Sequence, residues 1–291
     1  MLRLVLPKGS LEEQTLQLFQ DADLRVRRSS PRDYHGRIED ERIEAVSLLR
    51  PQEIPTYVAD GLFDLGITGR DWIVETGADV EEIASLEYAK SGTGHGVRIV
   101  LAVPNEHPAT RARELPSDSR ISTEYVNLTR RYFDDLGIPV HVVWSYGATE
   151  AKVPQIVDAI VDVTETGSTL RAHGMKIIGT LLESEVLLIA NRGSSADPAK
   201  RGAMRDVTTL LLGALRAEGR VLIKLNVPAD QLSAVLDVVP SMKSPTISQL
   251  SDGGYAIETV VDKGSVNTLI PLLKASGGTD ILELPISKIV P

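Results

Sequence analysis

Short apolar runs alternate with amphipathic segments along most of the chain. Continuous apolar runs bounded by polar residues or glycine are typical of buried strands, whereas apolar residues three and four positions apart are typical of helices. The pattern predicts strands at Leu2–Leu6, Ile43–Leu49, Leu62–Thr68, Val97–Val103, Arg120–Glu124, Val140–Val143, Ala159–Val163 and Val186–Ala190. It predicts helices at Leu11–Phe19, Gln52–Asp60, Leu128–Leu136, Glu150–Val157 and Arg201–Glu218, with another beginning at Asp71. This alternation indicates an α/β fold with a mainly parallel sheet.

A glycine-rich segment, Gly92–Gly96, divides this part of the chain into two similar α/β halves. The later apolar run Val186–Ala190 is interpreted as a return to the first half. We therefore expect lobe I to comprise residues 1–91 and 178–212, and lobe II residues 92–177. Ligands of such folds bind outside the carboxyl ends of the strands, so we expect a cleft where these ends meet.

The C-terminal part, residues 213–291, has a different order of predicted strands and helices. It predicts strand, helix, two strands, helix and strand, at Val221–Val227, Ala229–Val239, Thr246–Leu250, Tyr255–Val261, Gly264–Ala275 and Ile281–Ile289. The turn Ser251–Gly254 would join the two central strands as a hairpin. The order βαββαβ is that of a ferredoxin-like domain.

Composition narrows the possible functions. The chain has 291 residues with 42% hydrophobic and 24% charged, the balance of an ordinary globular protein. A formal net charge of −9 and an aromatic content of 4% argue against a nucleic-acid-binding surface. There is no cysteine, which excludes disulfides and thiolate metal sites. No apolar run has the length of a membrane span, and the first residues do not resemble a secretory signal, so we expect a cytoplasmic protein without a membrane partner.

The segment Ala159–Leu170 carries the most informative chemistry. A predicted strand leads into a loop of small and hydroxyl-bearing residues and then into a helix, an arrangement whose free N–H groups favour an anion. The loop residues are Glu165, Thr166, Gly167, Ser168 and Thr169. Because Asp162 and Glu165 would repel a bare phosphate, they suggest a ligand with sugar hydroxyls or a metal, such as a phosphorylated ribose. The alternative is an ordinary helix cap.

Other strand ends carry further candidates. Lys8 and Arg70 each lie between a predicted strand and a helix, where they are placed to reach polyphosphate, although each is also compatible with a solvated surface side chain. Asp71 is a candidate helix cap, and Glu124 and Glu150 lie near the starts of predicted helices. Two loop histidines, His95 and His173, have no partner at metal-ligand spacing, and no Ser/His/Asp or Cys/His pattern for a nucleophile stands out.

Taken together, these segments resemble the ATP phosphoribosyltransferase family. The resemblance rests on five segments in order, namely Pro7–Leu11, Leu49–Pro51, Asp64–Asp71, Thr123–Arg130 and Asp158–Leu170. It covers nearly the whole chain, and the C-terminal part is similar to the regulatory domain of the long form of this family. The sequence departs from it at Ser10, where many relatives have arginine, and at His173, where asparagine is more usual.

The resemblance implies a two-lobed, periplasmic-binding-protein-like catalytic core with a C-terminal ferredoxin-like regulatory domain. It implies transfer of 5-phosphoribosyl from phosphoribosyl pyrophosphate to N1 of ATP, the first step of histidine biosynthesis, with Mg²⁺ on the pyrophosphate. The implied catalytic residues are Lys8, Arg70 and Glu124. Phosphoribosyl pyrophosphate would bind Asp162 and residues 165–169, and ATP or its polyphosphate would bind Arg50, Gly69 and Glu150. Histidine would inhibit through Ser244 and Thr246 in a homodimer that assembles into a hexamer.

Two other functions remain compatible with the sequence. A two-lobed solute receptor would have the same lobes, although a phosphate loop with two acids is unexpected there. A ligand-sensing regulator would use the C-terminal domain and an inert cleft. Both alternatives predict ligand binding without turnover.

Overall fold

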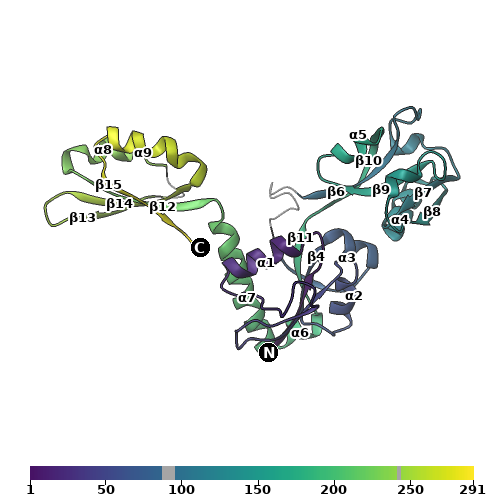
Figure 1. The fold of residues 1–291 in the computed structure, drawn as a ribbon, viewed down its shortest axis with the longest axis horizontal. Coiled ribbons are helices and arrows are strands. Elements are labelled where there is room, and N and C mark those ends of the chain that lie inside the picture. The colour runs from purple at the N-terminus through teal and green to yellow at the C-terminus, as the bar shows by residue number, and fades with distance from the viewer. Residues whose placement is uncertain (87–95, 241–243) are drawn as a thin grey trace. The chain divides into compact units, whose positions relative to one another are not determined.

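A computed structural model describes residues 1–86, 96–240 and 244–291 of the chain. It divides into two compact units (Figure 1). The first contains residues 1–19 and 24–208, and the second contains residues 20–23 and 209–291. Among the described residues, no helix has both the length and the apolarity needed to cross a membrane.

Lobe I of the first unit is built on a six-stranded sheet with the order β2-β3-β1-β4-β11-β5. Its strands are β1 (Leu2–Pro7), β2 (His35–Gly36), β3 (Ile43–Leu49), β4 (Leu65–Gly69), β5 (Glu81–Leu86) and β11 (Val186–Ala190). Its helices are α1 (Glu12–Asp21), α2 (Ile54–Ala59), α3 (Arg70–Thr76), α6 (Arg192–Ala196) and the start of α7 (Pro198–Ala217). Strands β3, β1 and β4 are parallel, so the loops after β1, β3 and β4 share one edge of the sheet.

Lobe II is built on a five-stranded sheet with the order β10-β6-β9-β7-β8. The strands are β6 (Val97–Pro104), β7 (Ser119–Thr123), β8 (Val140–Trp144), β9 (Ala159–Thr164) and β10 (Met175–Ser184). Helices α4 (Val126–Leu136) and α5 (Ser168–Ala172) follow β7 and β9, and two 3₁₀ turns cover Ala112–Glu114 and Thr149–Lys152. Strand β10 stays in this sheet to Ser184, and only Glu185 separates it from β11 of lobe I. The residue boundaries proposed above for the two lobes stay a prediction. In the strand pairing, the chain returns to the sheet of lobe I after Ser184.

The second unit contains a four-stranded antiparallel sheet with the order β13-β14-β12-β15. Its elements are β12 (Arg220–Val227), a 3₁₀ turn (Ala229–Gln231), α8 (Leu232–Leu236), β13 (Thr246–Gln249), β14 (Tyr255–Asp262), a second 3₁₀ turn (Lys263–Ser265), α9 (Val266–Ala275) and β15 (Thr279–Pro285). Helices α8 and α9 lie on the same face of the sheet (Figure 1). Alternate residues of β12, from Val221 to Val227, are buried with the helices in one core. The expected ferredoxin-like order is confirmed, including the 251–254 hairpin turn.

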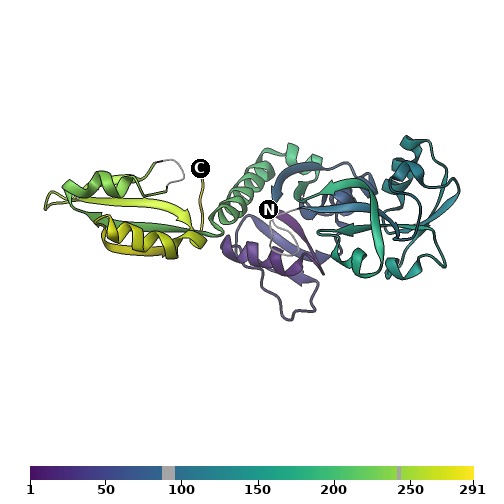
Figure 2. The same cartoon turned by 90° about the horizontal axis from the view of Figure 1, so that it is seen from above.

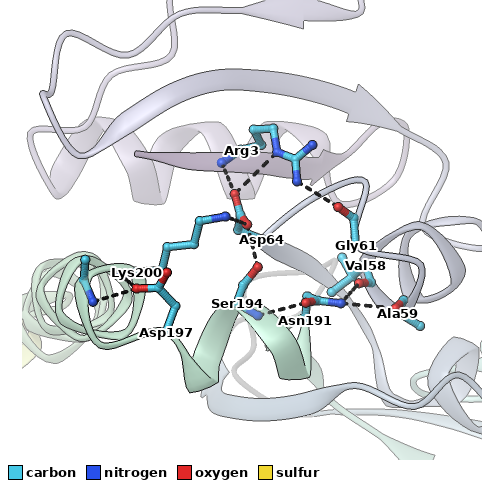
Figure 3. Close-up of polar contacts among 10 residues, drawn as sticks. Arg3, Val58, Ala59, Gly61, Asp64, Asn191, Ser194, Asp197 and Lys200 are labelled. Carbon is cyan, nitrogen blue, oxygen red and sulfur yellow. Dashed lines mark hydrogen bonds and ion pairs between the residues drawn. The ribbon is translucent and has the colours of Figure 1, made fainter.

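A long helix, α7, is uninterrupted from Pro198 to Ala217 and so passes from the first unit into the second (Figure 2). Its start is attached to lobe I through Asp64, whose side chain is fully buried. The carboxylate accepts hydrogen bonds from the backbone N–H of Arg3 at 2.7 Å, the hydroxyl of Ser194 at 2.6 Å and the ammonium of Lys200 at 2.7 Å (Figure 3). Burial by itself raises the pKa of Asp64. The hydrogen bonds from these donors have the larger, opposite effect, so the pKa lies below its ordinary value.

Several predictions of local structure are wrong. No helix covers 150–157: after a single 3₁₀ turn the chain becomes extended at Val153, because a residue before proline is restricted to extended backbone. The last strand ends at Pro285, which cannot continue the hydrogen-bond ladder. Both sheets of the first unit are mixed rather than mainly parallel, since β11 and β10 run antiparallel to their neighbours. Strand β5, rich in acids, was not anticipated.

Candidate active site

A cavity of about 370 Å³ is lined by residues of both lobes. This volume is in the range of small-molecule binding sites. Lobe I contributes Lys8, Ser10, Arg50 and Gly69, and lobe II contributes Glu124 and Asp162. These residues come from loops after β1, β3, β4 and β7 and from β9, so the cleft lies where the sequence predicted it. Of the glycine-rich segment Gly92–Gly96, only Gly96 is described, and it also lines the cavity.

Lobe I lines the cavity with the cations Lys8 and Arg50, and the acidic residues Asp71 and Glu185 line it as well. The ammonium of Lys8 lies 3.7 Å from the carboxylate of Glu12 and 5.0 Å from the centre of the Tyr34 ring. Glu12 also pairs with Arg28 at 2.8 Å and accepts the N–H of Gly9. Burial raises the pKa of Glu12, but the Gly9 N–H and these two cations lower it to a net value below normal. Glu12 therefore stays ionised and holds Lys8 in place.

Arg50 and Arg70 differ in their environments. Arg50 lines the cavity, and within the described parts of the chain its guanidinium has no carboxylate partner. Arg70 is not among the lining residues. Its guanidinium pairs with Glu185 at 2.7 Å and Glu82 at 3.0 Å, and the hydrogen bond to Glu185 raises its pKa. The structure thus places Arg50 where it is available to an anion and holds Arg70 in an ion-pair cluster.

The lobe II wall is acidic. Glu124 follows β7, and Asp162 lies in the adjacent strand β9, where its carboxylate accepts the backbone N–H of Val163 at 2.7 Å. Both side chains line the cavity. Cations of lobe I and carboxylates of lobe II therefore line one cavity, an arrangement suited to a ligand that carries both phosphates and hydroxyl or amine donors.

The loop predicted to bind phosphate directly follows Asp162 and Val163 of the cavity wall. It is folded by its own contacts, since the hydroxyl of Thr164 accepts the N–H of Gly167 at 2.9 Å and the hydroxyl of Thr166 donates to that of Ser168 at 3.0 Å. Gly167 is the N-cap of α5, with a φ of 74° and no side-chain cap bond. Ser168 and Thr169 are exposed. The loop residues 165–169 do not line the 370 Å³ cavity itself.

A second strand-to-helix junction in lobe II, between β7 and α4, already holds an anion supplied by the protein. The carboxylate of Glu75, from α3 of lobe I, accepts the backbone N–H groups of Asn127 at 2.9 Å and Leu128 at 2.8 Å. The side-chain amide of Asn127 donates to the carbonyl of Glu75 at 3.0 Å. Sequence reasoning missed Glu75. At the 164–169 junction, the N–H groups of Gly167 and Ser168 are bonded instead to the loop hydroxyls of Thr164 and Thr166.

Four lining residues at the back of the cavity were not among the predicted site residues, namely Asp71, Trp72, Tyr125 and Ser184. Asp71, which was expected to cap α3, accepts hydrogen bonds from the hydroxyls of Tyr125 at 2.8 Å and Ser184 at 2.6 Å. Trp72 stacks on Tyr125, with ring centres 4.6 Å apart. Burial, followed by the charge of Asp71, raises the pKa of Tyr125 well above its ordinary value. Tyr125 therefore remains a hydrogen-bond donor.

The remaining candidates lie elsewhere. Glu150 lies in the 3₁₀ turn of lobe II and does not line the cavity. His173 is exposed, and its Nδ1 lies 2.9 Å from the carbonyl of Thr169. His95 lies outside the described residues. Ser244 and Thr246 are exposed in the second unit, the latter at the start of β13. Within residues 1–86, 96–240 and 244–291, no cluster of three or more His, Cys, Asp or Glu could hold a metal alone.

The fold and the cavity together define a two-lobed α/β protein with a cleft for a polyanionic ligand and an appended ferredoxin-like domain. The family model described as "HisG: ATP phosphoribosyltransferase" matches residues 50–213, and the one described as "HisG, C-terminal domain" matches residues 217–288. This chain belongs to the ATP phosphoribosyltransferase family, in its long form.

Individual relatives agree along the whole length. The ATP phosphoribosyltransferase of Desulforudis audaxviator is 50% identical, with 100% of this chain and 99% of the relative covered. That of Pelotomaculum thermopropionicum is 47% identical, also with 100% and 99% covered. Among solved structures, the ATP phosphoribosyl transferase (HisG:HisZ) complex from Thermotoga maritima matches with a TM-score of 0.61 at 27% identity. The match covers 72% of this chain and 96% of that one.

Proposed function

We propose that this chain transfers the 5-phosphoribosyl group of 5-phosphoribosyl-1-pyrophosphate to N1 of the adenine of ATP, the first step of histidine biosynthesis. The observation that carries the proposal is the single cavity lined by Lys8 and Arg50 of lobe I and by Glu124 and Asp162 of lobe II. Membership of the family over the whole chain supports the same reaction. Since both substrates are intracellular metabolites, we also propose that the protein works in the cytoplasm.

In this reaction the lone pair of N1 forms a bond to C1 of the ribose, while the bond from C1 to the pyrophosphate oxygen breaks and its electrons leave with pyrophosphate. The transition state carries oxocarbenium character, and no covalent enzyme intermediate is needed. The contribution of the protein is therefore positioning and electrostatic stabilisation. Lys8 and Arg50 suit the pyrophosphate and triphosphate, and Gly69 is a weaker candidate for a backbone contact to them. Glu124 suits the adenine amine.

The loop 165–169 is our candidate for the 5-phosphate. The N–H groups at the start of α5 and the hydroxyls of Thr166, Ser168 and Thr169 would supply the donors. The N–H groups of Gly167 and Ser168 would exchange their bonds to loop hydroxyls for bonds to the phosphate. Asp162 and Glu165 would accept the ribose hydroxyls. Arg70 and Glu150 remain weaker candidates for polyphosphate contacts, and Arg70 would have to leave Glu185 to make one.

Magnesium fits this site as an ion carried by the substrate. The cavity offers the hard carboxylate oxygens of Glu124 and Asp162, and Mg²⁺ typically binds one or two carboxylates together with substrate phosphates. When bound, the ion would neutralise charge on the departing pyrophosphate. The protein's own cations Lys8 and Arg50, which line the same cavity, would hold the same group.

We further propose that histidine inhibits the enzyme by binding the second unit, where Ser244 and Thr246 are candidates for its contacts. Inhibition requires that histidine bind a less active state more tightly than the active one. A homodimer that assembles into a hexamer would provide such alternative states. The solved complex from Thermotoga maritima, an assembly of two kinds of chain, supports assembly in this family.

A direct assay tests the reaction. Purified protein is mixed with ATP, phosphoribosyl pyrophosphate and Mg²⁺ in the presence of pyrophosphatase, and the ultraviolet absorbance of phosphoribosyl-ATP is followed. We expect an increase that depends on both substrates. Folded protein that binds ligands without any absorbance change would instead be a receptor or sensor.

A further inference from the structure

Helices α3 of lobe I and α4 of lobe II cap each other. The carboxylate of Glu75, only 6% exposed, binds the first free N–H groups of α4. In return, the side chains of Asn127 and Arg131 in α4 donate to the carbonyls of Glu75 and Val74 near the end of α3. Each helix thus satisfies backbone groups that the other would leave unpaired, and their separation and orientation are fixed by directional bonds.

A second set of bonds lies one helical turn away, at the back of the cavity. Asp71, only 5% exposed, accepts from Tyr125 of the β7–α4 junction and from Ser184 at the end of β10. The hydroxyl of Ser184 also accepts the N–H of Asp71 at 3.0 Å. Gly69 makes this geometry possible, because a Cβ there would lie 2.0 Å from the Asp71 carboxylate.

These buried carboxylates are not needed for a stable contact between lobes. An apolar surface of similar volume is often at least as stable as a buried ionic group, and Trp72 already packs within the lobe II core. What a carboxylate adds is direction, because its bonds form only at one relative position of the partners. The partners here are the segments that carry Gly69 in lobe I and Glu124 in lobe II.

We propose that Asp71 and Glu75 are positioning residues that hold lobe II against lobe I so that Glu124 lines the same cavity as Lys8 and Arg50. Neither carboxylate touches the reacting atoms. Both act through Tyr125 and the N-terminus of α4, which directly follow Glu124. The inference rests on the proposed transfer reaction, which requires groups from both lobes at one time. The 5-phosphate loop, by contrast, is folded by contacts inside lobe II.

Three single variants test the proposal. Tyr125→Phe removes one hydroxyl, Asp71→Asn removes the charge, and Glu75→Gln replaces one of the two acceptor oxygens with an amide donor that faces an N–H. We expect kcat to fall by about ten- to a hundred-fold, as small displacements of reacting groups do. Binding of ribose 5-phosphate, measured by calorimetry, should stay within about two-fold, because the loop is intact. The double variant Asp71→Asn with Tyr125→Phe should lower kcat little more than either single variant, since both substitutions break the same hydrogen bond.

Tyr132→Phe is the matched control. It removes a tyrosine hydroxyl from α4, the helix that Tyr125 precedes, and this hydroxyl makes no hydrogen bond to any described residue. It should leave kcat and ribose 5-phosphate binding unchanged. Wild-type kcat in both Tyr125→Phe and Glu75→Gln would overturn the proposal, as would a parallel loss of turnover, ribose 5-phosphate binding and unfolding midpoint. If the wild-type protein itself makes no phosphoribosyl-ATP, the transfer reaction and this inference fall together.

Discussion

Thr169 is the residue at which the phosphate-loop proposal is most easily tested. Its side chain is exposed in the first turn of α5. Thr169→Val keeps the shape and removes the hydroxyl, so it should raise the dissociation constant for phosphoribosyl pyrophosphate by about ten-fold, the value of a hydrogen bond to a charged group. Affinity for ATP should stay the same. Calorimetry checks both, with the exposed Thr180→Val as control; unchanged affinity would remove Thr169 from the site.

Arg50 and Arg70 differ in what a polyanion would have to displace. Arg50 has no carboxylate partner among the described residues, whereas Arg70 is held by Glu82 and Glu185. We expect Arg50→Ala to lower kcat/KM by about ten- to a hundred-fold, the loss of one or more charge-assisted hydrogen bonds. Arg70→Ala should lower kcat/KM by a smaller factor. Steady-state kinetics of the two variants decide between them, and a larger loss for Arg70→Ala would make Arg70 the phosphate ligand.

At the scale of elements, the turn that starts α5 depends on a glycine. Gly167 has a φ of 74°, and a Cβ there would lie 2.9 Å from the guanidinium of Arg171 and 3.3 Å from Ile177. Gly174, at the other end of α5, has a φ of 69° and open space for a Cβ. Alanine at either site should cost about 1–2 kcal/mol of unfolding free energy from the backbone alone.

Only Gly167→Ala should also displace the loop and raise the KM for phosphoribosyl pyrophosphate. Gly174→Ala is its control for backbone strain. Equal KM values in the two variants would show that the loop shape does not matter to the substrate. Denaturant unfolding and steady-state kinetics of both proteins give the comparison.

The attachment of α6 and α7 to lobe I has a defined pH dependence. The pKa of Asp64 is lower in the folded chain than its ordinary value of 3.8. Its stabilisation is therefore complete above pH 3.8 and is lost as the pH falls through the folded pKa. Asp64→Asn should lower the unfolding free energy by about 1–3 kcal/mol at neutral pH.

The difference between wild type and Asp64→Asn should shrink below pH 3.8, because protonation removes the same charge from the wild-type protein. Urea unfolding of both proteins across this range provides the measurement. A constant difference down to the lowest accessible pH would mean that the carboxylate charge contributes nothing.

At the scale of the whole molecule, the two compact units are expected to respond to different ligands. Phosphoribosyl pyrophosphate with Mg²⁺ should slow hydrogen exchange in the first unit, most strongly in peptides covering 159–173. Histidine should slow exchange in the second unit, around 244–262. Binding to the native state protects the amides that it orders. Hydrogen-exchange mass spectrometry measures the protection of amides in both units. If histidine protected amides of the first unit alone, the second unit would not be the regulatory one.

Local patterns encode a large part of this architecture. Apolar runs such as Ile43–Leu49 and Ala159–Val163 are strands because their side chains are buried in a sheet. The order βαββαβ follows from the same kind of periodicity, and the phosphate-loop candidates are neighbours in the chain. The absence of a helix at 150–157 was also readable from Pro154, whereas β5 carries too many acids to resemble a core strand.

Contacts between distant residues were beyond such reasoning. Glu75 and Asp71 looked like ordinary helix acids, yet one caps a helix of the other lobe and the other binds Tyr125 and Ser184. The sequence could not distinguish Arg70 from Arg50 either, since only the folded chain brings Glu185 beside one of them. Periodicity and turn chemistry act over a few neighbouring residues, so they specify elements and their order. Two features depend on distances that exist only after the sheets have packed. They are the ion pairs that neutralise particular charges and the hydrogen bonds that join the two lobes.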